Sequence, residues 1–186
     1  MKKITAVSIK LIAIVTIAIF AGCATPKIAA VKSPVYQEKS NFFSPAETRY
    51  YGDSITLMQP LAGKPDFSFF RLNYTITKKA SIWHASTFYL SKNLILDPTI
   101  IFELDGKVYT FSPEPRSKKG YGRLRKGYAE ETNQFVLPNS FIDNLKKSSS
   151  IVIRLSGQNY SQEKVLDRNE IGHLIYFINH INSLII

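Results

Sequence analysis

The chain has 186 residues, of which 45% are hydrophobic and 20% charged, and its formal net charge is +10 at pH 7. A chain of this length favours one domain with a sizeable core over several domains. Because it has a single cysteine, Cys23, it excludes an internal disulfide framework.

The N-terminus has the parts of a secretory signal. Lys2 and Lys3 precede an apolar stretch whose uninterrupted core runs from Leu11 to Ala21, and small residues stand directly before Cys23. A basic start, a short apolar region and small residues before the cleavage point are typical of such signals. An uncleaved transmembrane anchor is the alternative, but a spanning helix needs about 20 apolar residues, more than this core offers.

The run Ile19–Cys23 resembles the lipobox of bacterial lipoproteins, and the resemblance covers only the first 23 residues. It implies that residues 1–22 are a cleaved signal peptide and that Cys23 carries the lipid that holds the protein to a membrane. The mature chain then has no free thiol, which excludes redox catalysis and a cysteine nucleophile. Ala24, in place of Asp, implies the outer membrane, facing the periplasm, in an organism with two membranes. In any other organism the resemblance implies the outer face of the cell membrane.

Residues 23–48 are predicted to form a lipidated N-terminus followed by a flexible tether. Three prolines, Pro26, Pro34 and Pro45, stand there among small and polar residues, and no sustained hydrophobic periodicity appears before Tyr50. We therefore expect a single globular domain over residues 49–186.

From Tyr50 onward the hydrophobic pattern favours antiparallel strands. In residues 70–77 apolar and polar side chains alternate, which predicts a strand with one buried face. Residues 82–90 are rich in aromatic and β-branched side chains and have apolar residues on both faces. They are therefore predicted to form a strand in the interior of a sheet.

A hairpin is predicted at Asp105-Gly106, a dipeptide typical of a type I′ turn. The turn fixes which bulky side chains share one face, in the pairs Leu104–Lys107, Phe102–Tyr109 and Ile100–Phe111. The opposite face, with the pairs Glu103–Val108 and Ile101–Thr110, is expected to be the wetter one.

Two helices are expected after the hairpin. Short apolar runs at 134–137 and 151–155 flank residues 139–147, which are predicted to form a short helix with Asn139 as its N-cap. Residues 168–184 are predicted to form an amphipathic C-terminal helix, which begins with an acidic cap at Asp167 and Glu170 and whose apolar face extends to Ile185. The fold class is therefore α+β, an antiparallel sheet, sandwich-like or partly rolled, with a docked terminal helix.

Residues 116–128, which we call the basic segment, contain no acidic residue. Cleavage of the signal leaves 21 of the 24 basic residues against 14 acidic ones, a net charge of +7, and six of the basic residues lie in this segment. They are Arg116, Lys118, Lys119, Arg123, Arg125 and Lys126. A focused positive charge attracts anions. The compartment implied by Cys23 favours an anionic lipid headgroup, a cell-wall polymer or an envelope protein over nucleic acid. The alternative is a solvated connection without a partner.

The three histidines are the remaining candidates for catalysis or metal binding. His173 and His180 are seven residues apart on the predicted C-terminal helix, about 10.5 Å along its axis, which is too far to bind one metal ion. His84 follows Trp83 in a predicted strand and is expected to be a packing residue. The sequence contains no nucleophile-elbow, zinc-protease or phosphate-loop motif. No catalytic residue, metal or cofactor is therefore predicted.

Two functional hypotheses follow from these patterns. The first is a membrane-anchored envelope lipoprotein that acts as a non-enzymatic accessory, assembly or binding module and uses the basic segment to bind an anionic envelope partner. The second is a lipid-anchored periplasmic hydrolase that uses His84 or His173 with a carboxylate brought close by folding.

Overall fold

The computed structural model describes residues 35–40, 47–58, 66–92, 97–114, 129–158 and 160–185. The strands are β1 (Tyr36–Ser40), β2 (Glu47–Met58), β3 (Phe67–Ile76), β4 (Ser81–Ser91), β5 (Thr99–Leu104), β6 (Lys107–Phe111), β7 (Ala129–Leu137), β8 (Ile151–Gly157) and β9 (Tyr160–Val165). The helices are α2 (Asn139–Lys147) and α3 (Arg168–Ile185). No helix in these ranges is both long enough and apolar enough to cross a membrane.

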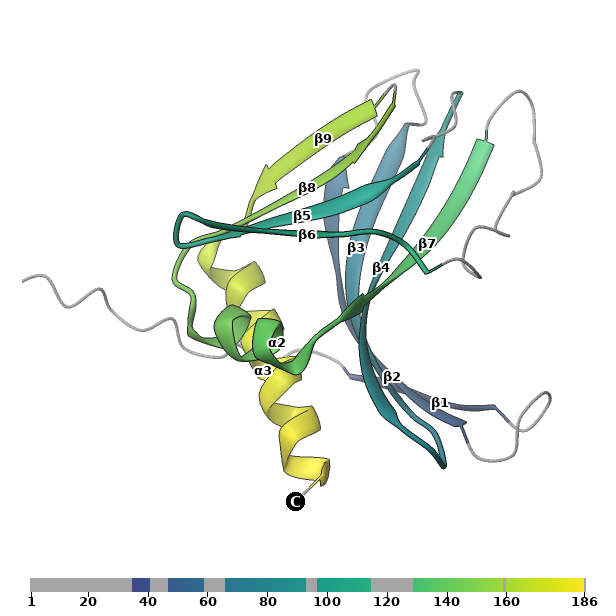
Figure 1. Cartoon of the computed structure of the whole chain (residues 1–186), viewed down its shortest axis with the longest axis vertical. Helices are drawn as coiled ribbons and strands as arrows, with labels where there is room; N and C mark the ends of the chain where they lie inside the picture. The colour runs from purple at the N-terminus through teal and green to yellow at the C-terminus, as the bar shows by residue number, and fades with distance from the viewer. Residues whose placement is uncertain are drawn as a thin grey trace, which may run out of the picture.

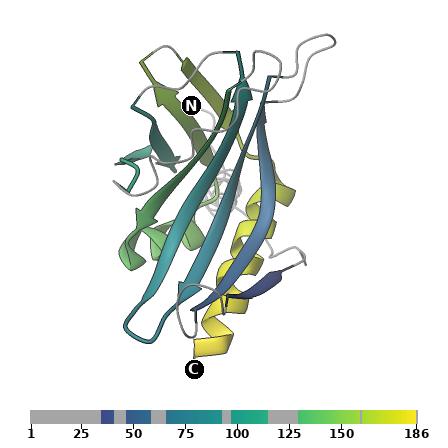
Figure 2. The ribbon, with the colours of Figure 1, turned by 90° about the vertical axis from the view of Figure 1, so that its right-hand side faces the viewer.

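The strands form two antiparallel sheets. The large sheet has the order β1-β2-β3-β4-β7 and the small sheet the order β6-β5-β8-β9. Both the small sheet and α3 lie on one side of the large sheet, which we call its inner face (Figure 1). Figure 2 looks onto the opposite side, the outer face, with α3 behind the strands. The predicted α+β class, with antiparallel strands and a C-terminal helix, is confirmed.

The core lies against the inner face of the large sheet. Phe70 on β3 is fully buried, and its ring meets that of Phe102 on the small sheet edge-on, with centroids 5.6 Å apart. Trp83 on β4 packs in the same way against Phe177 on α3, with centroids 5.8 Å apart. One continuous hydrophobic core therefore joins the large sheet to both the small sheet and the terminal helix.

The two strands expected from the hydrophobic pattern are present as β3 and β4. Phe70, Leu72 and Tyr74 are buried, as the alternation of residues 70–77 predicts. β4 lies between β3 and β7, so its expected place in the interior of a sheet is confirmed. The polar side of β3 is drier than the pattern suggests, because Asn73 and Thr75 are also buried.

The hairpin between β5 and β6 has the predicted register. Ile100, Phe102 and Leu104 pair with Phe111, Tyr109 and Lys107. Asp105 and Gly106 have φ angles of 47° and 86°, the left-handed values that a type I′ turn requires. The carboxylate of Asp105 accepts hydrogen bonds from the amides of Ser149 and Ser150, so the turn is also tied to the residues before β8.

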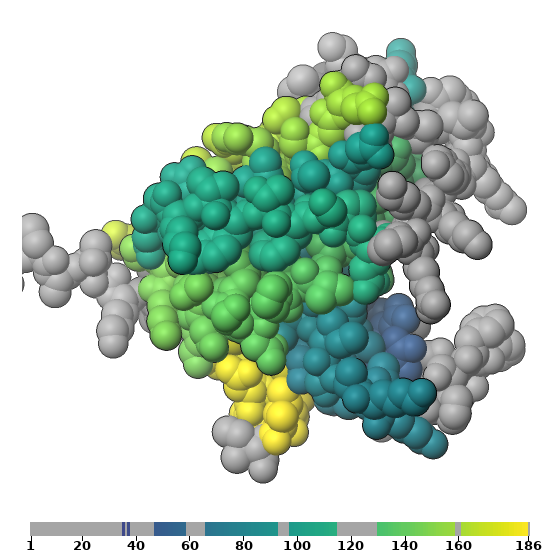
Figure 3. All heavy atoms as spheres, viewed as in Figure 1, coloured from purple at the N-terminus to yellow at the C-terminus, as the bar shows by residue number. Residues whose placement is uncertain are grey.

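Helix α2 has the expected bounds but not the expected cap. Pro138 occupies the N-cap position without a side-chain hydrogen bond, and Asn139 is the first helical residue. The extended backbone of Pro138 directs its carbonyl at the helix, where it accepts hydrogen bonds from the amides of Phe141 and Ile142. Phe141 packs on Phe102, Tyr109 and Phe111, and Figure 3 shows the hairpin (teal) lying directly over α2 (green).

Helix α3 begins with the predicted acidic cap. The amide of Glu170 donates to the carboxylate of Asp167 at 2.9 Å, and the amide of Asp167 donates to Glu170 at 3.0 Å. This reciprocal pair is a capping box. The apolar face ends earlier than expected, since Ile181 is fully buried whereas Ile185 is 53% exposed.

The ordered sheet begins earlier in the chain than predicted. β1 pairs with β2 from Tyr36 to Ser40, and β2 itself begins at Glu47, so the boundary expected at residue 49 is wrong and the predicted tether, residues 23–48, contains an edge strand. An edge strand needs only backbone hydrogen bonds to one neighbour, which explains why no hydrophobic periodicity marks it. Residues 1–34, with the predicted signal peptide and Cys23, lie outside the described residues.

Candidate functional site

The residues predicted to bind or to carry lipid lie outside the described part of the chain. These are Cys23 and the six basic residues Arg116, Lys118, Lys119, Arg123, Arg125 and Lys126. The structure does describe both flanks of the basic segment. The amide of Glu114 donates to the carbonyl of Gln134 at 2.9 Å, and β7 begins at Ala129. Because β7 is an edge strand of the large sheet, the two described residues that flank the basic segment, Glu114 and Ala129, both lie at that edge.

The outer face of the large sheet combines aromatic, basic and amide side chains. Residues paired across its strands form rows, because neighbouring strands keep their register. The three central rows are Thr56–Phe69–Phe88–Thr132, Ser54–Arg71–Ser86–Gln134 and Tyr51–Asn73–His84–Val136. An aromatic row, a cationic row and an amide–imidazole row thus follow one another along the sheet.

The aromatic row contains two stacked rings. Phe69 and Phe88 face each other across β3 and β4 with centroids 5.1 Å apart and planes 10° apart. Phe67 tilts against both rings, at 5.7 Å from Phe69 and 6.2 Å from Phe88. We call these three residues the aromatic cluster. All three are half-buried, so part of each ring remains open to solvent.

Arg71 lies between two aromatic rings. Its guanidinium carbon is 5.6 Å from the ring centre of Phe69 and 5.8 Å from that of Tyr51. Its Nε and Nη2 donate to the hydroxyl of Ser54 at 3.0 and 2.6 Å. No ion pair joins Arg71 to an acidic residue within the described ranges. The guanidinium therefore has a fixed orientation but no counter-charge from the part of the chain that the structure describes.

The next row along the sheet contains an amide with an unused acceptor. Asn73 is 5% exposed, and its Nδ2 donates to the hydroxyl of Ser86. Its Oδ1 is buried and has no hydrogen-bond partner among the residues that the structure describes. On the inner face, the hydroxyl of Thr87 and the Nδ2 of Asn133, on paired residues of β4 and β7, are unpartnered in the same way.

His84 stands next to Asn73 on the outer face, half-buried. Burial lowers the pKa of its imidazole below the usual 6.5, and Arg49 lowers it further, whereas Glu114 and Glu47 oppose the shift. A neutral imidazole is therefore favoured near neutral pH. It can donate one hydrogen bond and accept another.

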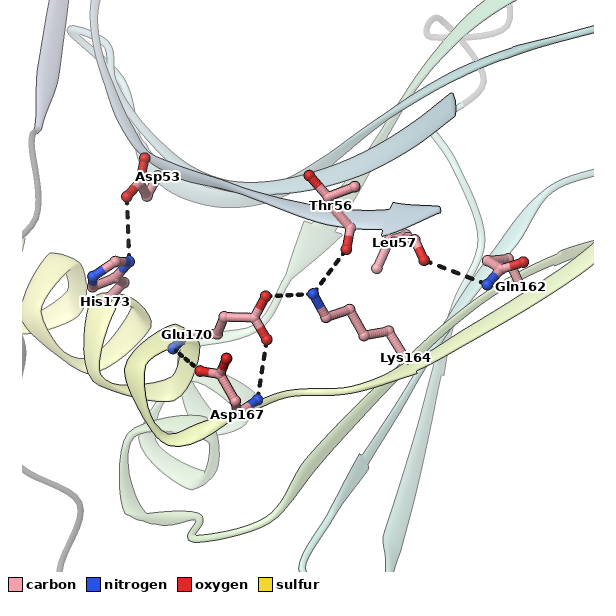
Figure 4. A network of polar contacts seen from close by, with 8 residues as sticks. All are labelled: Asp53, Thr56, Leu57, Gln162, Lys164, Asp167, Glu170 and His173. Carbon is pink, nitrogen blue, oxygen red and sulfur yellow. Dashed lines mark hydrogen bonds and ion pairs between the residues drawn. The ribbon is translucent and has the colours of Figure 1, made fainter. Parts of the chain in front are cut away.

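The second candidate histidine, His173, faces β2 on the inner side of the large sheet. Its Nδ1 lies 3.2 Å from a carboxylate oxygen of Asp53, and the two side chains are 29% and 34% exposed. An i, i+3 contact between Glu170 and His173 is the pairing that the sequence allows. Instead, Glu170 contacts Lys164, and the histidine contacts a carboxylate that lies far away in the sequence (Figure 4).

The surroundings of His173 are a row of polar contacts between β2 and the chain from β9 to α3. The amine of Lys164 donates to the carbonyl of Thr56 at 3.0 Å, and Gln162 donates to the carbonyl of Leu57 at 3.4 Å (Figure 4). Each of these contacts joins α3 or β9 to β2. The arrangement therefore fastens the helix and the small sheet to the large one.

The two histidines of the hydrolase hypothesis lie on opposite sides of the large sheet. Trp83 and Ala85 point into the core, so His84 between them points outward, whereas α3 carries His173 on the inner side. Within the described residues, no three His, Cys, Asp or Glu side chains gather closely enough to hold a metal ion.

The outer-face residues were not predicted as a site from the sequence. Alternation alone marked Arg71 and Asn73 as the solvent side of a strand. One sequence pattern does point to this face. Residues 82–90 have apolar side chains on both sides of the strand, including Phe88, which indicates that the outward side of β4 also carries an apolar surface. Comparisons of the chain with protein-family models, with curated proteins and with solved structures find no match.

Proposed function

We propose that this chain is a lipid-anchored protein of the bacterial cell envelope whose domain is a non-enzymatic binding or assembly module for an anionic partner. Its anchor would be the lipid on Cys23, as the lipobox resemblance implies. Its binding surface would be the basic segment together with the outer face of the large sheet.

The observation that carries this proposal is the position of the two described residues that flank the basic segment. Glu114 is hydrogen-bonded to β7 and Ala129 begins it, so both flanks lie at the edge of the face on which Arg71 has no acidic partner among the described residues. Arg71 is on β3, two strands from β7, which corresponds to about 10 Å at the usual strand spacing. The segment between these flanks supplies six further positive charges in the sequence, and a focused positive potential raises the local concentration of anions.

Crosslinking in intact cells tests the binding proposal. The test variant changes the six basic residues of the segment to Gln. The control variant changes six exposed basic residues elsewhere, Lys78, Lys79, Lys107, Lys146, Lys147 and Arg168. We expect the test variant to lose a crosslinked partner that the wild type and the control both retain. Identical crosslinks in all three proteins would contradict the proposal.

The anchor is tested separately by mass spectrometry of the mature N-terminal peptide. We expect that peptide to begin at Cys23 and to carry lipid. A Cys23→Ser variant should leave the membrane fraction after cell lysis. An unmodified Cys23 in the mature protein would refute the anchoring mechanism and leave the crosslinking result intact.

A hydrolase is a second candidate function, supported by the 3.2 Å contact between His173 and Asp53. A carboxylate that orients an imidazole is one element of nucleophilic catalysis. The test compares wild type and His173→Gln on ester, amide and phosphoester substrates. Activity that disappears with the imidazole would favour this candidate. Equal turnover by both proteins, or none by either, would leave the contact with the structural role described above.

A further inference from the structure

We propose that the outer face of the large sheet binds an acidic saccharide, with the sugar ring on the aromatic cluster and its carboxylate on Arg71. This inference rests on the proposed function and names the chemistry of the anionic partner. Three observations carry it: the donors left on Arg71, the unused acceptor of Asn73 and the spacing of apolar and polar rows.

The first observation is the orientation of Arg71. A guanidinium has five N–H donors arranged as a planar fork. Ser54 uses the edge formed by Nε and Nη2, and the rings of Phe69 and Tyr51 lie within 6 Å of the guanidinium. The edge formed by Nη1 and Nη2 keeps its outward donors. Two parallel donors on one edge match the two oxygens of a carboxylate, the bidentate geometry that arginine favours.

The second observation is the acceptor beside this cation. Asn73 and Arg71 lie two residues apart on β3, so their side chains are on the same face of the strand. The Oδ1 of Asn73 is buried without a donor, and a buried acceptor without a partner is costly. This oxygen has no accessible surface in the free protein, so a neighbouring side chain has to move aside on binding, and a ligand hydroxyl next to the carboxylate then supplies the missing donor. Neutral His84, in the same row, offers both a donor and an acceptor to a second hydroxyl.

The third observation distinguishes a saccharide from a lipid. An acyl chain needs a long continuous apolar path. The apolar side chains of this face fill only two neighbouring rows, Phe67–Leu90 and Phe69–Phe88, and the next row along the sheet contains Arg71, while Thr56 and Thr132 flank the aromatic row at its two ends. Neighbouring rows on one face are about 7 Å apart along the strands. The apolar and polar parts of a sugar ring are separated by a similar distance, since its C–H face packs on aromatic rings while its edges carry hydroxyls and the carboxylate.

Binding of oligogalacturonate, measured by isothermal titration calorimetry on the full lipoprotein in a non-ionic detergent, tests this inference. Its matched control ligand is the same oligomer with methyl-esterified carboxylates, which keeps the ring and removes the charge. We expect the free acid to bind at least about tenfold more tightly than the ester, the difference that charge-assisted hydrogen bonds give. Equal binding of the two ligands, or no binding of either, would overturn the inference.

The protein variants locate the ligand on the outer face. Arg71→Gln should weaken binding of the free acid at least about tenfold, and Arg71→Lys should weaken it by a smaller factor because it retains charge but loses the fork. Arg154→Gln, at an exposed position in the small sheet, is the control and should bind as the wild type does. Far-ultraviolet circular dichroism and a thermal melt confirm that each variant is folded. Unchanged affinity in folded Arg71→Gln would overturn the inference.

Two further results separate this inference from the proposed function. Vesicles containing phosphatidylglycerol are the lipid probe. Binding to these vesicles with no binding to oligogalacturonate would refute the saccharide as the ligand but would still agree with the proposed function, which requires only an anionic partner. Loss of the cellular crosslink on neutralising the basic segment, together with a crosslink unaffected by Arg71→Gln, would also refute this inference alone. A crosslink that persists in both the basic-segment variant and Arg71→Gln would refute this inference and the proposed function together.

Discussion

Gly52 on β2 lies directly against the ring of Phe177 on α3. A Cβ at Gly52 would be 3.1 Å from the ring and 3.1 Å from the carbonyl oxygen of Leu72. The register of β2 shifts between Tyr51 and Ser54, where a bulge directs Gly52 toward the helix. The close approach of the terminal helix to the large sheet therefore depends on a residue without a side chain.

We expect Gly52→Val to lower the free energy of unfolding by about 1–3 kcal/mol, the range for overpacking a tight contact. Urea denaturation measures it, with Thr110→Val at an exposed strand position as the control for β propensity. Because the Phe177 ring is one of the two obstacles, beside the carbonyl oxygen of Leu72, Phe177→Leu should recover part of the loss in the double variant, beyond additivity. Strictly additive effects would show that the two residues do not meet.

Loss of the capping box at α3 should destabilise the domain moderately. Asp167→Ala removes an acceptor from the amide of Glu170 and is expected to lower the unfolding free energy by about 1 kcal/mol. Asp167→Asn keeps an acceptor oxygen and should lose less. Equal losses in the two variants, measured by denaturation at one pH, would argue against the hydrogen bond as the cause.

The sequence predicts well those elements that are determined by interactions between residues close together in the chain. The Asp105-Gly106 turn sets the register of its hairpin within a few residues, and the Asp167–Glu170 box sets the start of α3. β1 has no such signal, because its backbone bonds to β2 do not require an apolar side chain. The contact between His173 and Asp53 joins residues far apart in sequence and exists only after the helix docks.

The candidate site on the outer face could not be predicted from the sequence for a similar reason. Arg71 reads as an ordinary polar position of an alternating strand, and its proximity to Tyr51 depends on the pairing of β2 with β3. Stacking of Phe69 on Phe88 likewise depends on the pairing of β3 with β4. Strand order and register, which a single sequence does not specify, create this site.

Thr87 offers a test of buried polarity on the inner face. Its side chain is 1% exposed, and its hydroxyl has no hydrogen-bond partner in the described part of the chain. Since a buried, unpartnered hydroxyl is costly, Thr87→Val should raise the unfolding free energy by about 1 kcal/mol. Thr132→Val, at an exposed position on the neighbouring strand, is the control and should change little. A loss of stability in Thr87→Val would mean that the hydroxyl contributes a favourable interaction.

His84 makes the stability of the domain depend on pH. Burial lowers the pKa of the folded imidazole below 6.5, so the unfolded chain takes up a proton at a higher pH than the folded chain does. The unfolded state then binds more protons as the pH falls. Stability is therefore fully present above about pH 6.5 and is lost as the pH falls through the folded pKa.

His84→Gln removes this titration and keeps a polar side chain on the outer face. We expect the difference in unfolding free energy between about pH 7.5 and about pH 5.5 to be smaller in His84→Gln than in the wild type. Because Glu114 raises the pKa of His84, Glu114→Gln should enlarge the wild-type loss. Equal pH dependence in His84→Gln and the wild type would contradict the lowered pKa and, with it, the neutral imidazole that the outer face offers a ligand.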